Sequence, residues 1–498
     1  MRYIRRRLAQ ALLVVSFLAY YATVGVKQDR NSRDLQIEAN TRWKPTYAIA
    51  EAQKLYTEPT PKYPWTPDTT AVILNWSRLP NVVQIVKIMC TSLQDTLAEV
   101  LIWNNNPQPL ISEDFAEAHC PGRMLNIYNS PENVYFQARF FGCTHANTRF
   151  CFIQDDDYFI QPSIIRAMRA RMSETQSTSL HLLPSHEVLY SRSSTIRIDS
   201  SIHTLFAWLG YGSMMERSQA QEFLDLLQTI NATEDIFRMA DNYFTILSNR
   251  VPELWFDQNH ELGGGTPFTV GTLGEERNNN HIINAGLILD SLVQTFSQDV
   301  ALGYPYISIP TPFTQELPIT RAVCFDTSCV METNIKLLPM LPNESVTSAS
   351  DVINHTAERF SALGNEAMER YLEFPPSSAV DGNSTTSFRS VSDAVEDDWI
   401  ALDWMAADFG DNLELALLVN EATQNILENC RFEHSADGES WDQLPSELEC
   451  SASRVQSLRE CSVVIGGGFF RKVRLVLKTG VPCGWIVHEI WLRQSRPR

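Results

Sequence analysis

Hydrophobic positions in the first half of the chain fall into short apolar runs that alternate with longer segments of helical spacing. Runs of strand length lie at residues 70–74, 100–103, 124–128 and 149–153. Between these runs, residues 81–93 and 133–143 carry apolar side chains at helical spacing. This alternation predicts a parallel sheet covered by helices. We also expect helices at 164–172, 218–229 and 241–247, and short strands at 180–183 and 187–190.

The pattern changes after residue 374, where short strand-like runs follow one another. They lie at 399–402, 413–419, 430–434, 472–478 and 485–492. Turn signals such as Asp381-Gly382-Asn383 and Asp437-Gly438 separate several of these runs. This rhythm predicts an all-β sandwich over residues 375–498. Residues 336–374 hold a proline turn, two glycosylation sequons and one expected helix, and we interpret them as a connecting region.

Residues 8–26 form an uncharged apolar run that is long enough to span a bilayer. Four arginines lie in residues 1–7 and predict a cytosolic tail by the positive-inside rule. Residues 27–68 are polar and contain prolines, as expected of a stem. We therefore expect a transmembrane signal anchor and a single-pass type II protein of the Golgi or endoplasmic reticulum membrane, with its bulk in the lumen. The alternative is a cleaved signal peptide, whose apolar core is normally shorter.

Composition agrees with a luminal, globular protein. The chain has 498 residues, of which 44% are hydrophobic, and a net charge of −19. That charge argues against binding to nucleic acid, which needs a basic face. Ten cysteines suit an oxidising compartment, and their spacing does not favour zinc. Cys324 and Cys329 are close enough to close a small loop, whereas the spacing leaves the other pairings open.

Three consecutive carboxylates, Asp155, Asp156 and Asp157, follow the apolar run at 149–153. Buried carboxylates are costly unless they are paired, and the carboxyl end of a strand is where α/β sheets bind ligands. Hard divalent cations prefer oxygen ligands and leave positions for phosphate and water. The triplet therefore predicts a metal–diphosphate site, in which Asp157 binds the metal and Asp155 faces the ribose or a metal-bound water. Asp156 alternates away in an extended backbone. The alternative is a solvated acidic turn before the next helix.

Polar residues at neighbouring strand ends are candidates for the same nucleotide site. Arg78 and Arg139 carry guanidinium forks that match phosphate oxygens or hold the acidic turn, with surface salt bridges as the alternative. Asn75, Asn104 and Asn105 are candidates to contact the base or the ribose. Their alternative is strand-to-helix turn chemistry, for which asparagine is well suited.

Several motifs over residues 68–285 appear in an order typical of one enzyme family. They are Asn75-Trp76-Ser77-Arg78, Trp103-Asn104-Asn105, Gln137-Ala138-Arg139-Phe140, Asp155-Asp156-Asp157 and Asp241-Asn242-Tyr243-Phe244. This region resembles the exostosin-like glycosyltransferases, a metal-dependent family with the GT-A nucleotide-sugar fold. The resemblance implies a GT-A domain over residues 69–335 that uses Mn²⁺ or Mg²⁺ and a UDP-sugar and retains the anomeric configuration.

The resemblance also implies a catalytic residue. Asp241 matches an acidic residue that the family places before an Asn-Phe pattern, near the acceptor or the anomeric carbon. Glu234 and Asp235 lie close by in the sequence, so Asp235 is the second candidate for this role. A helix N-cap is the plain alternative for Asp241, because aspartate is common at that position.

Motifs of the last part of the chain resemble a second family. They lie at 380–388, 398–403, 432–435, 437–441, 470–477 and 487–491. This region resembles a discoidin-type (coagulation factor 5/8 type C) domain, a galactose-binding-like jelly-roll sandwich, and the resemblance implies glycan binding on loops at one end. Trp399, Trp441 and Trp485 either stack on sugars or fill the core. The Asp381-Gly382-Asn383 loop is either a structural Ca²⁺ site or a simple turn.

Together these patterns predict an α/β GT-A-type domain and a C-terminal all-β sandwich behind an N-terminal transmembrane helix. The expected activity is that of a hexosyl- or N-acetylhexosaminyltransferase. It would transfer a sugar from a nucleotide-sugar donor to a glycan, glycoprotein or glycolipid acceptor. The alternative is a membrane-anchored, non-catalytic glycan-binding protein.

Overall fold

The structure is a computed structural model. It describes residues 66–174, 179–198, 201–257, 260–264, 271–296, 304–308, 319–339, 348–405, 413–445, 447–455, 457–466 and 470–494. The expected tail, anchor and nearly all of the expected stem lie outside these residues. Within the described ranges, no helix is long and apolar enough to cross a membrane.

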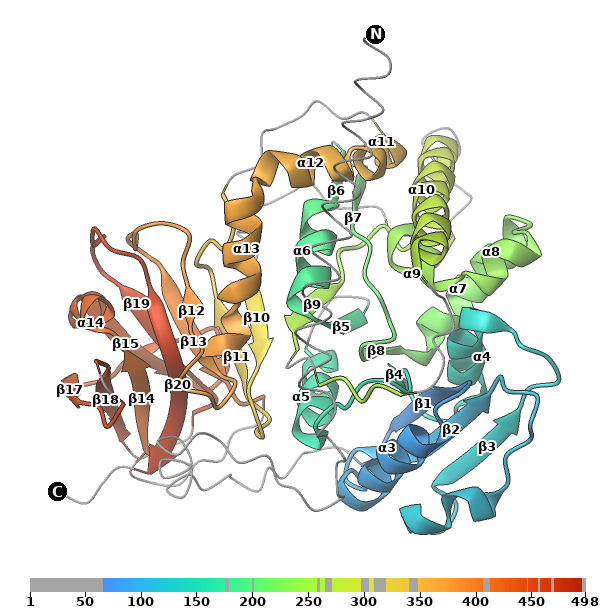
Figure 1. Cartoon of the computed structure of the whole chain (residues 1–498), viewed down its shortest axis with the longest axis horizontal. Coiled ribbons are helices and arrows are strands. Elements are labelled where there is room, and N and C mark those ends of the chain that lie inside the picture. Colours follow the sequence, from blue (N-terminus) through green and yellow to red (C-terminus); the bar gives the residue numbers. More distant parts are fainter. Residues whose placement is uncertain are drawn as a thin grey trace, which may run out of the picture. The chain divides into compact units, whose positions relative to one another are not determined.

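A mixed sheet forms the first half of the described chain (Figure 1). Its parallel part consists of β3 (Leu125–Asn129), β2 (Leu97–Asn104), β1 (Thr69–Asn75) and β4 (Phe150–Gln154). These four strands confirm the strands that were predicted at the four apolar runs of the sequence. The helices α3 (Leu79–Ser92) and α4 (Ala138–His145) follow β1 and β3, with the 3₁₀ segments η2 (Ser112–Ala118) and η3 (Tyr135–Gln137) in the connections.

The sheet is not purely parallel, which corrects the expectation from the alternating pattern. Strand β8 (Ser213–Glu216) lies antiparallel between β4 and β5 (Ser179–Leu183). Beyond β5, the strand β9 (Glu253–Phe256) is parallel to β5, and β10 (Thr320–Val323) is parallel to β9. Residues 187–190, which we expected to form a strand, belong to helix α6 (Ser185–Ser193). Pro184 precedes this helix with a φ of −64°, the backbone angle that prepares a helical start.

The remaining helices cover this sheet or connect it to the C-terminal part of the chain. Expected helices are present as α5 (Pro162–Met172), α7 (Arg217–Thr229) and α9 (Asp241–Leu247). Elements that the sequence did not predict are α8 (Glu234–Arg238), α10 (Gly271–Phe296) and the hairpin β6 (Ile196–Ile198)–β7 (Ile202–Thr204). The connecting region holds three helices instead of one: α11 (Ala349–Asn354), α12 (Thr356–Leu363) and α13 (Asn365–Glu373).

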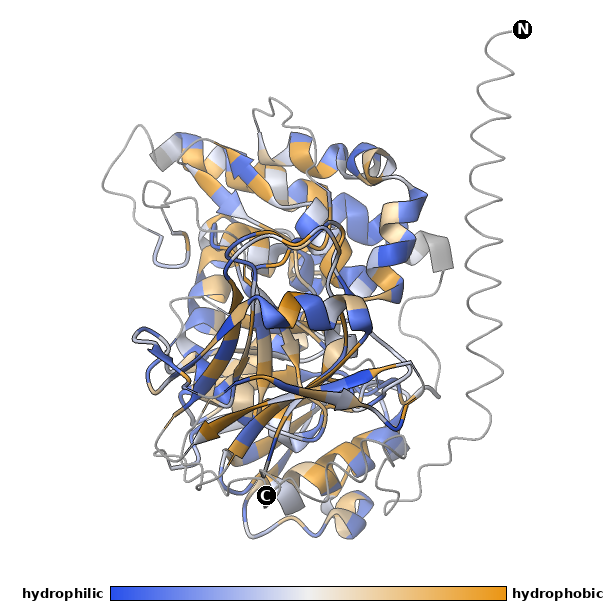
Figure 2. Cartoon of the chain, turned by 90° about the vertical axis from the view of Figure 1, so that its left-hand side faces the viewer, coloured by the Kyte–Doolittle hydropathy of each residue, from blue (hydrophilic) through white to orange (hydrophobic). Residues whose placement is uncertain are grey.

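The C-terminal part is the expected all-β sandwich, and its strands alternate between hydrophobic and hydrophilic residues (Figure 2). One layer holds β13 (Trp399–Asp403), β19 (Lys472–Leu477), β15 (Cys430–Ser435) and β16 (Asp442–Gln443). The other holds β12 (Phe388–Arg389), β20 (Ile486–Gln494), β14 (Leu413–Val419), β18 (Arg459–Gly466) and β17 (Glu449–Ala452). The short elements η4 (Pro376–Ala379) and α14 (Glu421–Glu428) complete this part.

The two halves are joined by a continuous sheet. Strand β11 (Val330–Thr333) pairs antiparallel with both β10 and β13, so the mixed sheet runs into the first layer of the sandwich. One hydrophobic cluster includes Leu183 and Phe256 from the first half together with Leu415 and Leu475 from the sandwich. The hydrophobic core is therefore continuous across the junction of the two halves.

A closed ring of charged side chains lies at this junction, with cations and anions alternating around it. Its members, in order, are Arg171, Glu253, Arg321, Glu332, Lys472, Asp403, Arg471 and Glu174. The Arg321–Glu332, Lys472–Glu332 and Arg471–Asp403 pairs have separations of 2.8, 2.9 and 2.7 Å. Because each buried carboxylate meets cations, the ring balances charges that would be costly alone.

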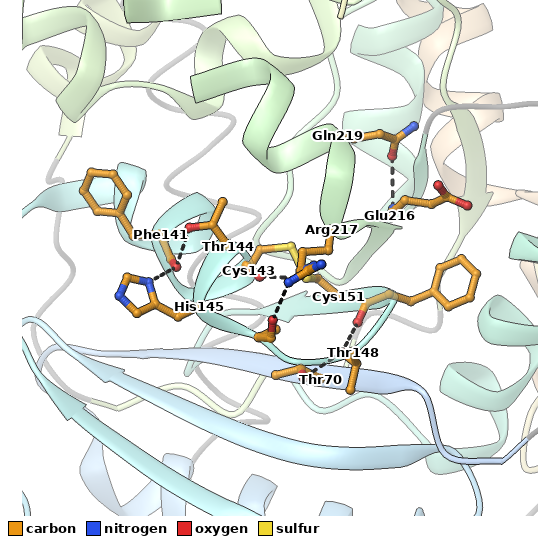
Figure 3. The surroundings of a disulfide bond; sticks show 12 residues. Thr70, Phe141, Cys143, Thr144, His145, Thr148, Cys151, Glu216, Arg217 and Gln219 are labelled. Carbon is orange, nitrogen blue, oxygen red and sulfur yellow. Dashed lines mark hydrogen bonds between the residues drawn. A yellow bond between two sulfur atoms is a disulfide. The ribbon is translucent and has the colours of Figure 1, made fainter. Parts of the chain in front are cut away.

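Eight of the ten cysteines form disulfides, which suits the expected oxidising compartment. The pairs are Cys90–Cys120, Cys143–Cys151, Cys324–Cys329 and Cys450–Cys461. The Cys324–Cys329 pair confirms the small loop predicted from spacing. Figure 3 shows the Cys143–Cys151 bond, which ties α4 to β4. Nearby, Arg217 Nη1 donates to the Ala146 carbonyl at 3.2 Å and secures the end of α4.

Candidate functional site

The predicted polar residues Asn75 and Asn104 lie together where β1 and β2 end in register. Asn75 Nδ2 donates to Asn104 Oδ1 at 2.7 Å, and Asn104 Nδ2 donates to Asn129 Oδ1 at 2.8 Å. Both Asn75 and Asn104 are buried. Asn105 Nδ2 donates to the Tyr135 carbonyl at 3.2 Å. Their amides therefore hold the strand ends together, while Asn75 Oδ1 has no hydrogen-bond partner among the described residues.

The acidic turn follows β4 at the same edge of the sheet, and two arginines hold it. Arg139 is 2% exposed, and its Nη2 donates to both carboxylate oxygens of Asp155, at 2.7 and 2.6 Å. Arg78 Nη1 lies 2.9 Å from Asp156 Oδ1 and 3.4 Å from Asp157 Oδ2. Both predicted arginines thus contact the predicted carboxylates.

Helix α4 positions Arg139 between two carboxylates of different exposure. Its guanidinium also forms an ion pair with Asp241, which begins α9 and is 1% exposed. The Cys143–Cys151 disulfide ties α4 to the strand that ends at Asp155. The result is a chain of charges, Asp241–Arg139–Asp155, that runs from the protein interior to the acidic turn.

Exposure distinguishes the three carboxylates of the turn. The side chains of Asp155 and Asp157 keep 28% and 34% of their surface exposed, whereas Asp156 keeps 9%. Burial, and then the charge of Asp155, raise the pKa of Asp157 to about 7, although Arg78 opposes the shift. The same two causes raise the pKa of Asp156. Asp157 is thus the most exposed carboxylate of a turn that carries more negative than positive charge.

The exposed oxygens of Asp155 and Asp157 are the part of the acidic turn that a cation could reach. Among the described residues, no group of three or more His, Cys, Asp or Glu side chains could hold a metal ion. Magnesium sites in phosphate-handling enzymes often use one or two carboxylates, with phosphate and water as the other ligands. The half-exposed oxygens of Asp157 and Asp155 fit such a site.

Residues 260–264 lie against the acidic turn. The sequence did not predict this contact. Leu262 N donates to the Asp157 carbonyl at 2.7 Å. Arg78 Nε donates to the Gly264 carbonyl at 2.6 Å, and Asn81 Nδ2 donates to the carbonyls of Asp156 and Gly263 at 2.9 and 2.8 Å. Asn81 lies three residues after Arg78, at the start of the helix expected over residues 81–93, and the sequence did not predict its role.

A second polar cluster lines an open surface pocket of about 500 Å³ between α8 and α10, which stand near α9 in Figure 1. Its lining residues are Asp235, Glu276, Arg277, Asn280, His281 and Asn284. His281 Nε2 lies 3.4 Å from Asp235 Oδ2, and its Nδ1 lies 2.7 Å from the Tyr243 hydroxyl. Asn284 Nδ2 also donates to that hydroxyl, at 3.0 Å.

The two candidate catalytic aspartates therefore occupy different places. Asp241 is buried against Arg139, whereas the side chain of Asp235 is 75% exposed and faces the pocket. Helix α9 joins the two clusters, because Asp241 begins it and Tyr243 follows within its first turn. Burial lowers the pKa of His281, although Asp235 opposes the shift.

For Trp485, the structure decides between stacking on a sugar and filling the core of the sandwich. Trp485 is fully buried and donates from Nε1 to Asp398 Oδ2 at 3.1 Å, so it belongs to the core. Trp441 is half-buried, and the Arg474 guanidinium lies 3.7 Å from its ring centroid. In the Asp381 loop, Thr386 Oγ1 donates to Asp381 Oδ2 at 2.8 Å and the Asn383 amide donates to Asp381 Oδ1 at 2.8 Å, as in a simple turn.

No known family model matches the chain, and no curated protein matches it. Among solved structures, the mannosyltransferase PcManGT from Pyrobaculum calidifontis, in complex with GDP-Man and Mn²⁺, is 13% identical. It covers 52% of this chain and 77% of its own, with a TM-score of 0.30. CBM32-1 from a family 31 glycoside hydrolase of Clostridium perfringens is 20% identical. It covers 24% of this chain and 84% of its own, with a TM-score of 0.19. Similarities this weak assign neither a family nor a function.

Proposed function

We propose that this protein is a metal-dependent glycosyltransferase that binds the diphosphate of a nucleotide sugar at the acidic turn. One arrangement carries the proposal: Arg78 and Arg139 fix Asp156 and Asp155, while Asp157 stays half-exposed at the ends of parallel strands. Ligands of α/β sheets bind at this edge. A bound Mn²⁺ or Mg²⁺ supplies Lewis-acid stabilisation to the diphosphate leaving group.

Each residue of the turn has a distinct part in this proposal. Asp157 is the direct metal ligand, and Asp155 is the second ligand or faces the ribose. Asp156 acts as a positioning residue, because its carboxylate is turned toward Arg78 and away from solvent. Asn75 Oδ1 is buried and has no hydrogen-bond partner among the described residues, so a contact with the nucleoside requires the strand ends to open.

The acceptor side of the proposed site includes Asp235. Its exposed carboxylate faces a polar pocket with His281, Asn284 and Arg277, whose hydrogen-bonding groups suit a hydroxyl-rich ligand. Asp241 is better placed to act through Arg139 than to touch a substrate, because it is 1% exposed. We therefore assign Asp235 to the acceptor side and Asp241 to positioning.

Further parts of the proposal rest on the likeness of the sequence motifs to exostosin-like enzymes. They are UDP as the nucleotide, transfer of a hexose or N-acetylhexosamine, and retention of configuration. The acceptor is a glycan, glycoprotein or glycolipid of the Golgi or endoplasmic reticulum lumen. In this proposal the protein is anchored as a type II membrane protein, and the sandwich contributes glycan binding.

A donor screen tests the proposal. The purified protein is incubated with UDP- and GDP-sugars and Mn²⁺, and nucleotide release is followed with and without chelator. We expect release that chelator abolishes and that Asp157→Asn lowers by at least about 100-fold, the scale on which a lost charge-stabilising group acts. Asp225→Asn, on the exposed face of α7, is the matched control.

Two results would count against the enzyme. Undiminished turnover in Asp157→Asn would remove the metal site from the acidic turn. Absence of turnover with every donor, together with glycan binding that survives chelator, would favour the non-catalytic glycan-binding alternative. Retention of the melting temperature by Asp157→Asn shows that a loss of turnover comes from the site and not from unfolding.

A further inference from the structure

The segment that holds Trp208, Gly210 and Tyr211 packs against the acidic turn. The Asp155 amide donates to the Gly210 carbonyl at 2.9 Å. A Cβ atom on Gly210 would lie 2.2 Å from Asp155 Oδ2, so only glycine allows this approach. The aromatic side chains on either side of Gly210 are therefore held at the edge of the proposed donor site.

One carboxylate binds both of these aromatic side chains. Glu187 projects from α6, and its Oε2 accepts from Trp208 Nε1 at 3.1 Å. Its Oε1 accepts from the Tyr211 hydroxyl at 3.4 Å. Glu187 itself keeps 19% of its side chain exposed. This arrangement fixes two large, half-buried rings from a single point, as expected of a preorganised binding surface.

A third ring extends the surface to the metal-binding end of the turn. Tyr158 directly follows Asp157, and its ring lies edge-on to Tyr211 with 4.6 Å between centroids. The Tyr158 hydroxyl donates to Glu261 Oε1 at 3.4 Å. Tyr158, Tyr211 and Trp208 are all half-buried, so each keeps part of its surface for a ligand.

Two carboxylates lie beside the three rings. Glu187 contacts both Trp208 and Tyr211, and Glu261 Oε1 lies 3.4 Å from the Tyr158 hydroxyl. The basic side chain His186 lies 3.6 Å from Glu187, but burial lowers its pKa and favours the neutral form. A carboxylate on a ligand would therefore meet like charges, which is unfavourable.

We propose that Trp208, Tyr211 and Tyr158, positioned by Glu187, form a subsite for an uncharged sugar ring beside Asp157. Aromatic faces with a few fixed polar groups are typical of ligand sites, and the carboxylates of Glu187 and Glu261 beside the rings disfavour a sugar that carries its own carboxylate. The subsite rests on the proposed function. Its sugar belongs either to the nucleotide donor or to the end of the acceptor, and both share this chemistry.

Two experiments, called the donor arm and the acceptor arm, show whether the sugar in the subsite belongs to the donor or to the acceptor. The donor arm measures the affinity of the Mn²⁺-loaded protein for UDP, UDP-glucose, UDP-N-acetylglucosamine and UDP-glucuronate by calorimetry. The acceptor arm measures the KM of methyl glycosides of neutral sugars and of methyl glucuronide in the transfer reaction. Both arms compare the parent protein with Glu187→Gln, which is nearly isosteric and removes one of the two acceptor oxygens.

We expect Glu187→Gln to weaken the binding of the neutral sugar by about tenfold, which corresponds to about 1.4 kcal/mol. If the subsite holds the donor sugar, affinity for neutral UDP-sugars falls toward that of UDP. If it holds the acceptor, the KM of neutral glycosides rises while donor affinity is unchanged. Affinity for UDP alone stays constant in both cases, because UDP does not carry the sugar ring.

Further variants keep the test decisive. Tyr211→Phe keeps the ring and loses only the hydroxyl, so it should reproduce part of the Glu187→Gln effect without a change in folding. Glu113→Gln, on an exposed 3₁₀ segment, is the control. Unchanged sugar affinity in both arms for Glu187→Gln and Tyr211→Phe, or equal use of neutral and uronate substrates by the parent protein, overturns the subsite. Failure to bind UDP with Mn²⁺ would instead overturn the proposed function.

Discussion

The guanidinium of Arg139 lies against both carboxylate oxygens of Asp155, with Nη2 at 2.7 and 2.6 Å from them. It also pairs with the buried Asp241, so replacing it leaves two carboxylates without their cation. Removing one partner of a buried charge pair typically costs about 3–5 kcal/mol. We expect Arg139→Met to lower the free energy of unfolding by that amount in urea titrations.

The control for Arg139 is an arginine in an exposed pair. Arg149 is 65% exposed and lies 2.7 Å from Glu216. Exposed pairs contribute about 1 kcal/mol or less, so Arg149→Gln should be nearly neutral. Equal destabilisation by the two substitutions would show that Arg139 is not held between buried charges.

Patterns among neighbouring residues predicted most elements that carry the candidate site. Apolar runs marked β1, β2 and β4, and helical spacing marked α9, so the acidic triplet could be placed at the end of a buried strand. Residues 187–190 were predicted wrongly, because a run of only four residues, Glu187-Val188-Leu189-Tyr190, fits one turn of a helix as well as a short strand. That error hid Glu187, whose helix brings it to Trp208 and Tyr211.

Contacts between distant parts of the chain could not be predicted in the same way. Arg139 was expected either to bind phosphate or to hold the acidic turn, and nothing local decides between these two roles. Arg471 and Glu174 are 297 residues apart and still form an ion pair at the junction of the two halves. Such pairs depend on the path of the chain between them, as does the insertion of β8 antiparallel to its neighbours.

Gly210 should be sensitive to a single added methyl group. Its Cβ would lie 2.2 Å from Asp155 Oδ2 and 2.9 Å from Arg139 Nη2. Overpacking of this kind costs about 1–3 kcal/mol and displaces the atoms it meets. Gly210→Ala should therefore lower Mn²⁺-dependent nucleotide release by at least about tenfold, corresponding to about 1.4 kcal/mol in the barrier.

Gly122 offers a control with a similar cost to folding. Its φ is +53°, and a Cβ there meets nothing within 4 Å. An alanine at such an angle costs about 1–2 kcal/mol through the backbone alone. Gly122→Ala should lose stability but keep turnover per folded molecule. Similar turnover in both alanine variants would show that the approach of Gly210 to Asp155 is irrelevant to the reaction.

The charged ring at the junction should make the protein sensitive to acid. Burial alone would raise the pKa of Glu332, but Arg321 and Lys472 outweigh burial and lower it to about 2. A folded-state pKa below the ordinary value of 4.5 stabilises the protein above that pH, and the contribution is lost as the pH falls toward 2. Unfolding free energies measured between pH 6 and pH 2 should decline steeply.

Glu332→Gln separates this contribution from general acid unfolding. The variant should be less stable near neutral pH, because Arg321 and Lys472 lose a buried partner. Its stability should also decline less steeply below pH 4.5, since the group that titrates is gone. Glu439→Gln, on an exposed sandwich loop, is the control and should keep the parent's slope. Parallel curves for Glu332→Gln and the parent would contradict the paired state of Glu332.

The two unpaired cysteines should differ in reactivity. Cys430 is buried, and burial raises the pKa of its thiol to about 12, whereas Cys483 is half-buried. Because the thiolate is the reactive form, a thiol reagent at pH 8 should label Cys483 in the native protein and leave Cys430 unmodified. Without reductant, urea should expose two thiols per chain. Cys483→Ser should abolish native labelling and Cys430→Ser should not, while four or more thiols in urea would contradict the disulfide pairs.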